Sequence, residues 1–212
     1  MINELYKLEV ITSDEIFEGL ALNDTPSVLG RSDLMEDMIP GYGVSDVFRN
    51  WHQSNLRDVW NVPKVHGDIS DHNDFPGINM ILPAFSERAC EVLGPVLEAN
   101  GELLPLESKS GKYSFYNLTN VIDALDLNKS NCDFWCDPPT TAIDIEMYEF
   151  NEKIIGDSEI FRIIENPIAT IVSDKFLRRC QEAGLKGLCF RKIWPFDDDK
   201  LWREENIVIE LT

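Results

Sequence analysis

The densest group of side chains that could bind a metal ion lies in a single polar segment, residues 66–74. Imidazole and carboxylate groups together bind Zn, Mn or Fe, and a metal held in this way activates water for hydrolysis. The competing interpretation is a solvated, turn-rich loop, because the chain has few other histidines to complete a site. A metal-dependent hydrolase is therefore the alternative function, and it would use His66, Asp68, Asp71, His72 and Asp74.

The second group that could do chemistry is the pair Cys132 and Cys136, which has no histidine and no second cysteine pair near it in the sequence. A structural zinc site needs four close ligands, and a nucleophilic cysteine needs a positioned base. The glycine patterns GxxxxGK[ST] and GxGxxG, which bind phosphates, do not occur in the chain. The sequence therefore predicts no catalytic residue, no metal site and no cofactor.

Acidic and apolar residues alternate along residues 143–150, a segment that we predict to be a β-strand. Because successive side chains of a strand point to opposite faces, the apolar residues at 143, 145 and 147 should share one face. Carboxylates and a tyrosine should share the other, and such a face can match a cationic protein surface. The alternative is a solvent-facing strand that its charge keeps soluble. The predicted partner-binding residues are Asp144, Glu146, Tyr148, Glu149 and Glu152.

The charge of the chain restricts its partners. The 212 residues include 19 Lys and Arg against 38 Asp and Glu, which gives a formal net charge of −19. Such a field disfavours nucleic acid and anionic membrane surfaces as direct partners and favours a cationic protein. The sequence begins without the pattern of a signal peptide and contains no membrane-spanning stretch, and its five cysteines are irregularly spaced. These features predict a cytoplasmic protein.

Local patterns predict an α+β fold, with a mainly antiparallel sheet, a few helices and a loop-rich N-terminal third. Ser86 and Ser173 are suited to begin two helices, which Gly101 and Gly184 should end. Pro95 should kink the first helix or divide it into two short pieces. The segments predicted to be strands are residues 5–11, 112–118, 143–150, 160–164, 169–172, 188–194 and 207–211.

The composition changes along the chain. Residues 23–83 hold several prolines and polar runs, which favour loops with short elements. The predicted organisation is an N-terminal strand and loop-rich subdomain or arm over residues 1–75, followed by an α+β domain over residues 76–212.

Several segments of the second domain occur in a familiar order. They are SERA at 86–89, GELLPL at 101–106, YSFYNLTNVIDALD at 113–126, IFRI at 160–163, VSDKF at 172–176 and AGLKGLCF at 183–190. In this order they resemble a bacterial family of polymorphic-toxin immunity proteins, over about residues 74–194.

The resemblance implies an inhibitor, encoded beside a secreted antibacterial toxin, that protects the producing cell by binding that toxin. It transfers no catalytic residues. Asn117, Thr119, Asn120 and Asp123 are interpreted as a turn and helix cap rather than as an active site. The acidic charge adds the expectation of a basic toxin, such as a nuclease with a phosphate-binding cleft.

Overall fold

The N-terminal strand β1 (Leu5–Val10) lies in the interior of a six-stranded sheet, between β11 (Thr170–Ser173) and β12 (Leu188–Trp194). The computed structural model describes residues 2–11, 20–22, 55–67, 69, 73–78, 83–134, 142–195 and 208–212. The strand order is β13-β12-β1-β11-β10-β7, and all neighbours are antiparallel except β10 and β7. The remaining strands are β13 (Val208–Leu211), β10 (Ile160–Ile163) and β7 (Val121–Ile122).

Both faces of the six-stranded sheet are covered. Tyr6 and Leu8 face one hydrophobic cluster, while Leu5 belongs to another on the opposite face. The same division holds in β11, where Val172 and Ile171 belong to different clusters. The strands of this sheet are therefore apolar at consecutive positions, as expected when a sheet is buried on both sides.

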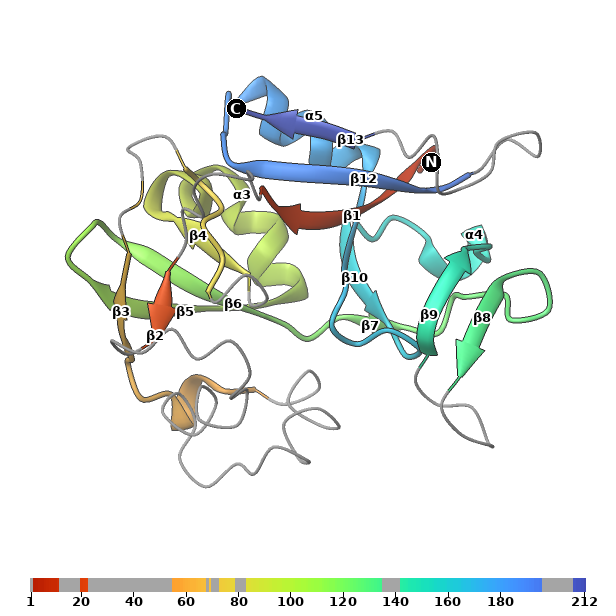
Figure 1. The fold of residues 1–212 in the computed structure, drawn as a ribbon, viewed down its shortest axis with the longest axis horizontal. Coiled ribbons are helices and arrows are strands. Elements are labelled where there is room, and N and C mark those ends of the chain that lie inside the picture. The colour runs from red at the N-terminus through yellow and green to blue at the C-terminus, as the bar shows by residue number, and fades with distance from the viewer. Residues whose placement is uncertain are drawn as a thin grey trace.

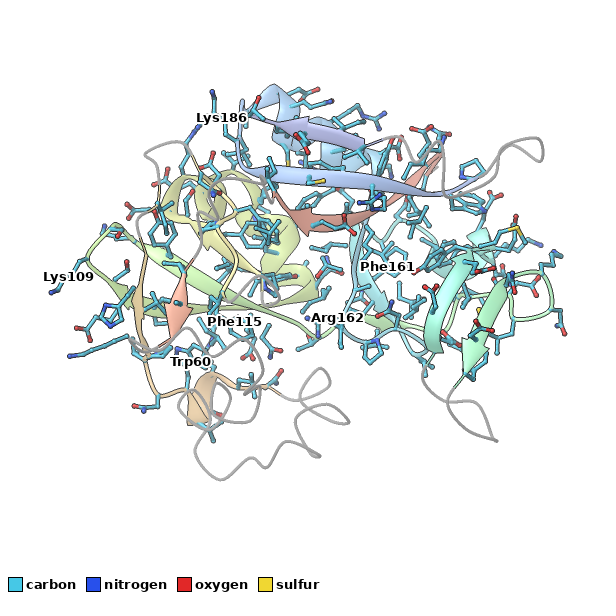
Figure 2. All side chains as sticks on the ribbon, viewed as in Figure 1. Trp60, Lys109, Phe115, Phe161, Arg162 and Lys186 are labelled. Carbon is cyan, nitrogen blue, oxygen red and sulfur yellow. The ribbon has the colours of Figure 1, made fainter. Side chains whose placement is uncertain are left out.

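A second sheet has five strands in the order β2-β3-β5-β6-β4. Its centre is an antiparallel hairpin in which Leu104 pairs with Phe115. Trp60 covers this hairpin, since its ring stacks on Phe115 at a centroid distance of 5.4 Å (Figure 2). The strands are β2 (Ala21–Leu22), β3 (Lys64–His66), β4 (Ala84–Ser86), β5 (Gly101–Ser108) and β6 (Tyr113–Leu118).

Helix α3 (Glu87–Asn100) packs between the two sheets (Figure 1). Ser86 begins it as predicted, because its hydroxyl accepts a hydrogen bond from the Ala89 N–H at 3.0 Å. The predicted break at Pro95 is wrong, since the helix is continuous through this residue. Pro95 and Glu91 are both exposed, so water can bind the carbonyl that Pro95 leaves without a donor.

Gly101 ends α3 for a reason other than a left-handed conformation. Its φ of 179° is open to any residue, but a Cβ there would overlap the carbonyl oxygen of Asn117 on the neighbouring strand. Glycine is therefore required by the close approach of two backbones. At the end of α5 (Asp174–Glu182), by contrast, Gly184 has a φ of 62°, the left-handed conformation expected there.

The smaller elements complete the described part of the chain. A two-stranded ribbon and the short helix α4 lie together on the right of Figure 1, at the end opposite the five-stranded sheet. They are β8 (Asn131–Phe134), β9 (Ala142–Met147) and α4 (Glu152–Ile155), and a 3₁₀ turn, η2, spans Arg57–Val59.

The α+β class and the mainly antiparallel pairing are confirmed. The division into residues 1–75 and 76–212 stays a prediction, although β1 pairs with strands from the second part. The prediction for residues 23–83 falls largely outside the described residues, which hold the short η2 and β3 in this stretch.

The packing of α3 predicts a large effect of a core substitution. Leu93 has no exposed surface, so Leu93→Ala should lower the free energy of unfolding by about 3 kcal/mol through lost contacts and a cavity. Val92, 38% exposed on the same helix, is the matched control, and Val92→Ala should change it by less than about 0.5 kcal/mol. Equal effects in urea unfolding would contradict this assignment of the core.

Candidate functional site

One residue of the segment suggested as a metal site, Asp74, makes structural contacts. The Asp74 side chain accepts hydrogen bonds from the Ser86 hydroxyl at 2.6 Å, from Arg88 Nη1 at 3.3 Å and from the Lys186 N–H at 2.9 Å. This buried carboxylate thus joins the start of α3 to the loop after α5. His66 is exposed on β3.

The rest of that predicted ligand set, Asp68, Asp71 and His72, lies outside the described residues. Within the described ranges, no three His, Cys, Asp or Glu side chains come together as a metal site would require.

The thiols of the described cysteines are not activated. Burial raises the pKa of Cys180 to about 12 and that of Cys189 to about 11. Burial also raises the pKa of Cys90 and of Cys132, and nearby carboxylates add to it. All four are protonated at neutral pH, the opposite of a nucleophilic cysteine. Cys136 lies outside the described residues.

The polar residues after β6 close the end of α3. Asn100 O accepts the backbone N–H groups of Thr119 and Asn120 at 3.0 Å, and Asn120 Nδ2 donates to Asn100 Oδ1 at 2.8 Å. Asn117 Nδ2 donates to the buried Glu102 at 2.9 Å. The interpretation as a helix cap is confirmed for Thr119 and Asn120, which bind the C-terminal end of the helix, whereas Asn117 makes its contact within the sheet. Asp123 is different, since its side chain is exposed.

Position 120 also marks the connection between the two halves of the fold. Asn120 O accepts the backbone N–H of Arg162 at 2.9 Å, and Figure 2 shows Arg162 near the middle of the molecule. Arg162 is 1% exposed, and burial lowers the pKa of its guanidinium to about 10, so it stays charged at neutral pH.

The β8–β9 ribbon carries the predicted acidic residues, but its alternation differs from the prediction. Asn131 pairs with Met147, whereas the next residue of β8, Cys132, pairs with Ile145, so Glu146 is an extra residue on β9. Such a β-bulge reverses the face of every later side chain. Met147 is therefore 36% exposed and Tyr148 only 7% exposed, the reverse of the expected faces.

The reversal places aromatic side chains where they hold the ribbon to the six-stranded sheet. Tyr148 stacks on Phe150 with a centroid distance of 5.8 Å, and Phe150 meets Phe161 and Trp194 edge to face at 6.4 and 6.2 Å. Ile145 faces the same cluster. The ribbon is thus fixed by its inner face, and its outer face is left for solvent or a partner.

The outer face of the ribbon holds a repulsive pair. Asp133 on β8 lies directly opposite Asp144 on β9, and both side chains are exposed. Like charges at opposed positions of two strands destabilise their pairing. The sequence pattern found Asp144 but missed Asp133, because the pairing of β8 with β9 depends on the bulges and not on either strand alone. We call Asp133, Asp144 and Glu146 the ribbon carboxylates.

The other predicted partner-binding carboxylates lie close by in the chain but differ in their contacts. Glu146 accepts a hydrogen bond from Asn131 Nδ2 at 2.8 Å across the ribbon. Glu149 is half-buried and accepts one from Trp194 Nε1 at 3.4 Å. Glu152 is exposed in the first turn of α4. The structure thus brings Asp144 and Glu146 together on the ribbon and gives Glu149 a structural contact.

Exposed apolar side chains occur on the same elements as these carboxylates. Leu127 precedes β8 and is 45% exposed, Met147 ends β9, and Ile154 in α4 is 51% exposed. Protein interfaces combine an apolar centre with a charged rim. The elements at this end of the fold offer both kinds of side chain.

The repulsive pair can be tested without any partner. Asp133→Asn should raise the free energy of unfolding by about 0.5 kcal/mol, because it removes one of two opposed charges. Asp144→Asn should do the same, and the double variant should gain little more, since the first substitution already removes the repulsion. Urea unfolding at low salt measures all three, and additive gains would show that the two carboxylates do not interact.

Comparison with known proteins supports one assignment. Residues 104–194 match the family model described as the immunity protein family Imm11. The matched range includes the ribbon, α4 and α5, and it begins later than the expected residue 74. No curated protein matches the chain. No helix in the described ranges is both long and apolar enough to cross a membrane. The predicted resemblance is confirmed: over residues 104–194, this chain is similar to the Imm11 family of immunity proteins.

Proposed function

We propose that this protein is an immunity protein that binds a cognate antibacterial toxin and neutralises it by covering its active or substrate-binding site. The observation that carries the proposal is the match to an immunity family over residues 104–194. An immunity protein acts by association and needs no catalytic group of its own. The four described thiols, whose raised pKa values keep them protonated, agree with that role.

We propose that the toxin binds at the end of the fold that carries the ribbon, and the distribution of charge supports this choice. Across residues 123–165 the sequence has only three cations, Lys129, Lys153 and Arg162, among many carboxylates. Lys129 is paired with Asp126 at 3.1 Å, and Arg162 is buried. The cations of α5, on the opposite face of the six-stranded sheet, are paired as well, with Asp157, Asp174 and Glu159. The binding face therefore presents negative charge to solvent.

A negative face fits a toxin with a basic cleft. We infer that the toxin is a nuclease, or another enzyme with a phosphate-binding cleft, that acts in the cytoplasm. A phosphate-binding cleft is lined by cations, and a carboxylate surface can occupy it in place of the substrate. The ribbon carboxylates, Glu149 and Glu152 are proposed to face that cleft, with Met147 and its apolar neighbours packed at the centre of the contact.

Copurification tests the function itself. An immunity gene is expected beside its toxin gene, so this chain, coexpressed with a catalytically inactive form of the protein encoded next to it, should elute as a stable complex. It should also abolish the toxicity of the active form in cells. Failure to bind or protect against either neighbouring gene product would reject the immunity function.

Ionic strength tests the proposed electrostatics separately. Stopped-flow association should slow steeply between low and physiological salt, while dissociation changes less, because long-range attraction is screened and packed contacts are not. The double variant Asp133→Asn, Asp144→Asn should associate more slowly at low salt. Glu98→Gln, on the exposed surface of α3, is the control that removes charge elsewhere. A salt-independent association rate would reject the basic cleft and leave the immunity function intact.

A further inference from the structure

Glu165 is a buried carboxyl group with an unfilled hydrogen-bonding position. It lies in the loop after β10 and is 6% exposed. Among the described residues, none donates a hydrogen bond to its Oε2. A buried polar atom without a partner destabilises a fold by about 1–3 kcal/mol, so such atoms are few in native proteins. Other buried carboxylates of this protein, Asp74 and Glu102, each accept several hydrogen bonds.

The surroundings of Glu165 disfavour the ionised form of its carboxyl group. Burial raises its pKa, its own backbone N–H opposes that effect, and the charge of Asp123 adds to it. The charge of Glu165 in turn raises the pKa of the nearby Cys132 thiol. Asp123 is exposed and its charge acts on Glu165, so an exposed and a buried carboxyl group interact here. The cation that both groups would favour is not supplied by the described part of the chain.

The loop that carries Glu165 is attached firmly to the ribbon. The Ala142 N–H, at the start of β9, donates to Glu165 O at 2.8 Å. Asn166 contacts Tyr148 through its side chain, and Asn166 Oδ1 accepts the Ala169 N–H at 3.2 Å. Because the backbone on both sides is held, Glu165 is positioned before any partner arrives. Such preorganisation lowers the entropy lost on binding.

The border of this position has the character of a protein-binding surface. Ile164 and Ile168 flank Glu165 in the same loop and are 46% and 42% exposed. The opposed pair Asp133 and Asp144 lies on the ribbon to which the loop is attached. Interface hot spots likewise have a buried anchoring group surrounded by contacts that exclude water.

We propose that Glu165 and Asp123 form the receptor for one arginine side chain of the toxin, with Glu165 as its buried end. This proposal rests on the proposed function and names a chemical group of the partner. A guanidinium donates several hydrogen bonds in a planar fork, so it can bridge two carboxylates. It is also less strongly hydrated than an ammonium group, so its transfer into a buried position is less unfavourable than that of lysine.

A first experiment needs no toxin. N-acetyl-arginine methylamide is titrated into the full ¹⁵N-labelled protein, and the amide chemical shifts are followed by NMR. The shifts of residues 123, 132 and 165 should move, and should move less with the blocked lysine analogue. They should stay unchanged in Glu165→Gln, whereas Glu98→Gln should respond as the wild type does. An absence of specific shifts at these residues in the wild type would overturn the proposal.

A second experiment measures affinity for the inactive toxin encoded by the neighbouring gene. Glu165→Gln should weaken binding about 10- to 100-fold, since one partner of a buried charge pair loses its charge. Glu98→Gln should weaken it less than about twofold. Equal affinities for the three proteins would overturn the arginine receptor while leaving the immunity function intact. If the wild type binds neither neighbouring product, the proposed function fails, and the arginine titration still decides the site.

The stability of the variants separates binding from folding. Because the pKa of Glu165 is raised by the fold, the contribution of Glu165 to the free energy of unfolding of the wild type should fall as the pH rises through the ordinary range of a glutamate and above it. Glu165→Gln should lack that loss and be at least as stable as the wild type at neutral pH. A Gln variant that is both destabilised and weaker in binding would show Glu165 to be a structural residue, against the proposal.

Discussion

The burial of one face of α3 is the constraint on which the rest of the fold depends. Ala89, Leu93 and Leu97 are fully buried, and they share one cluster with residues from both large sheets. Neither sheet alone surrounds this helix, so the six-stranded sheet must supply the opposite wall through β1 and its neighbours. The ends of α3 are held accordingly, by Asp74 at the start and by Asn120 at the end. The ribbon is attached to the far face of the same sheet.

Local features were predictable from the sequence, whereas features that depend on pairing were not. Ser86 and Ser173 were predicted to cap two helices. In the structure each serine hydroxyl accepts a hydrogen bond from the backbone N–H three residues later. Strand β5 was missed because Pro105 cannot donate to a neighbour. Its pairing with β3 involves only Glu107 and Ser108, so the missing N–H of Pro105 interrupts no bond.

The candidate site shows the same limit. A period of two was correct for Asp144 and Ile145, and it failed beyond the bulge, where Tyr148 turns inward and Met147 outward. A bulge depends on both strands, so it leaves no mark in the sequence of one. Asp133 and Glu165 were not found for a related reason. Each is an ordinary acidic residue in the sequence and becomes unusual only through what the fold places opposite it or around it.

The carboxylates of this protein differ in how many hydrogen bonds the fold gives them, and the difference follows their position in the fold. Glu102, on β5 of the five-stranded sheet, accepts hydrogen bonds from the N–H groups of Leu56 and Arg57 and from the side-chain amide of Asn117. At the ribbon end, by contrast, Asp133 and Asp144 are opposed to one another, and Glu165 Oε2 has no donor in the described part of the chain. A uniform excess of charge for solubility would not require a buried, unfilled carboxyl group or two aspartates placed face to face. Like charges opposed across two strands, and a buried oxygen without a donor, both lower the stability of the free protein. If the proposed partner is cationic, binding would remove part of that cost, so affinity would be gained at the expense of the stability of the free protein.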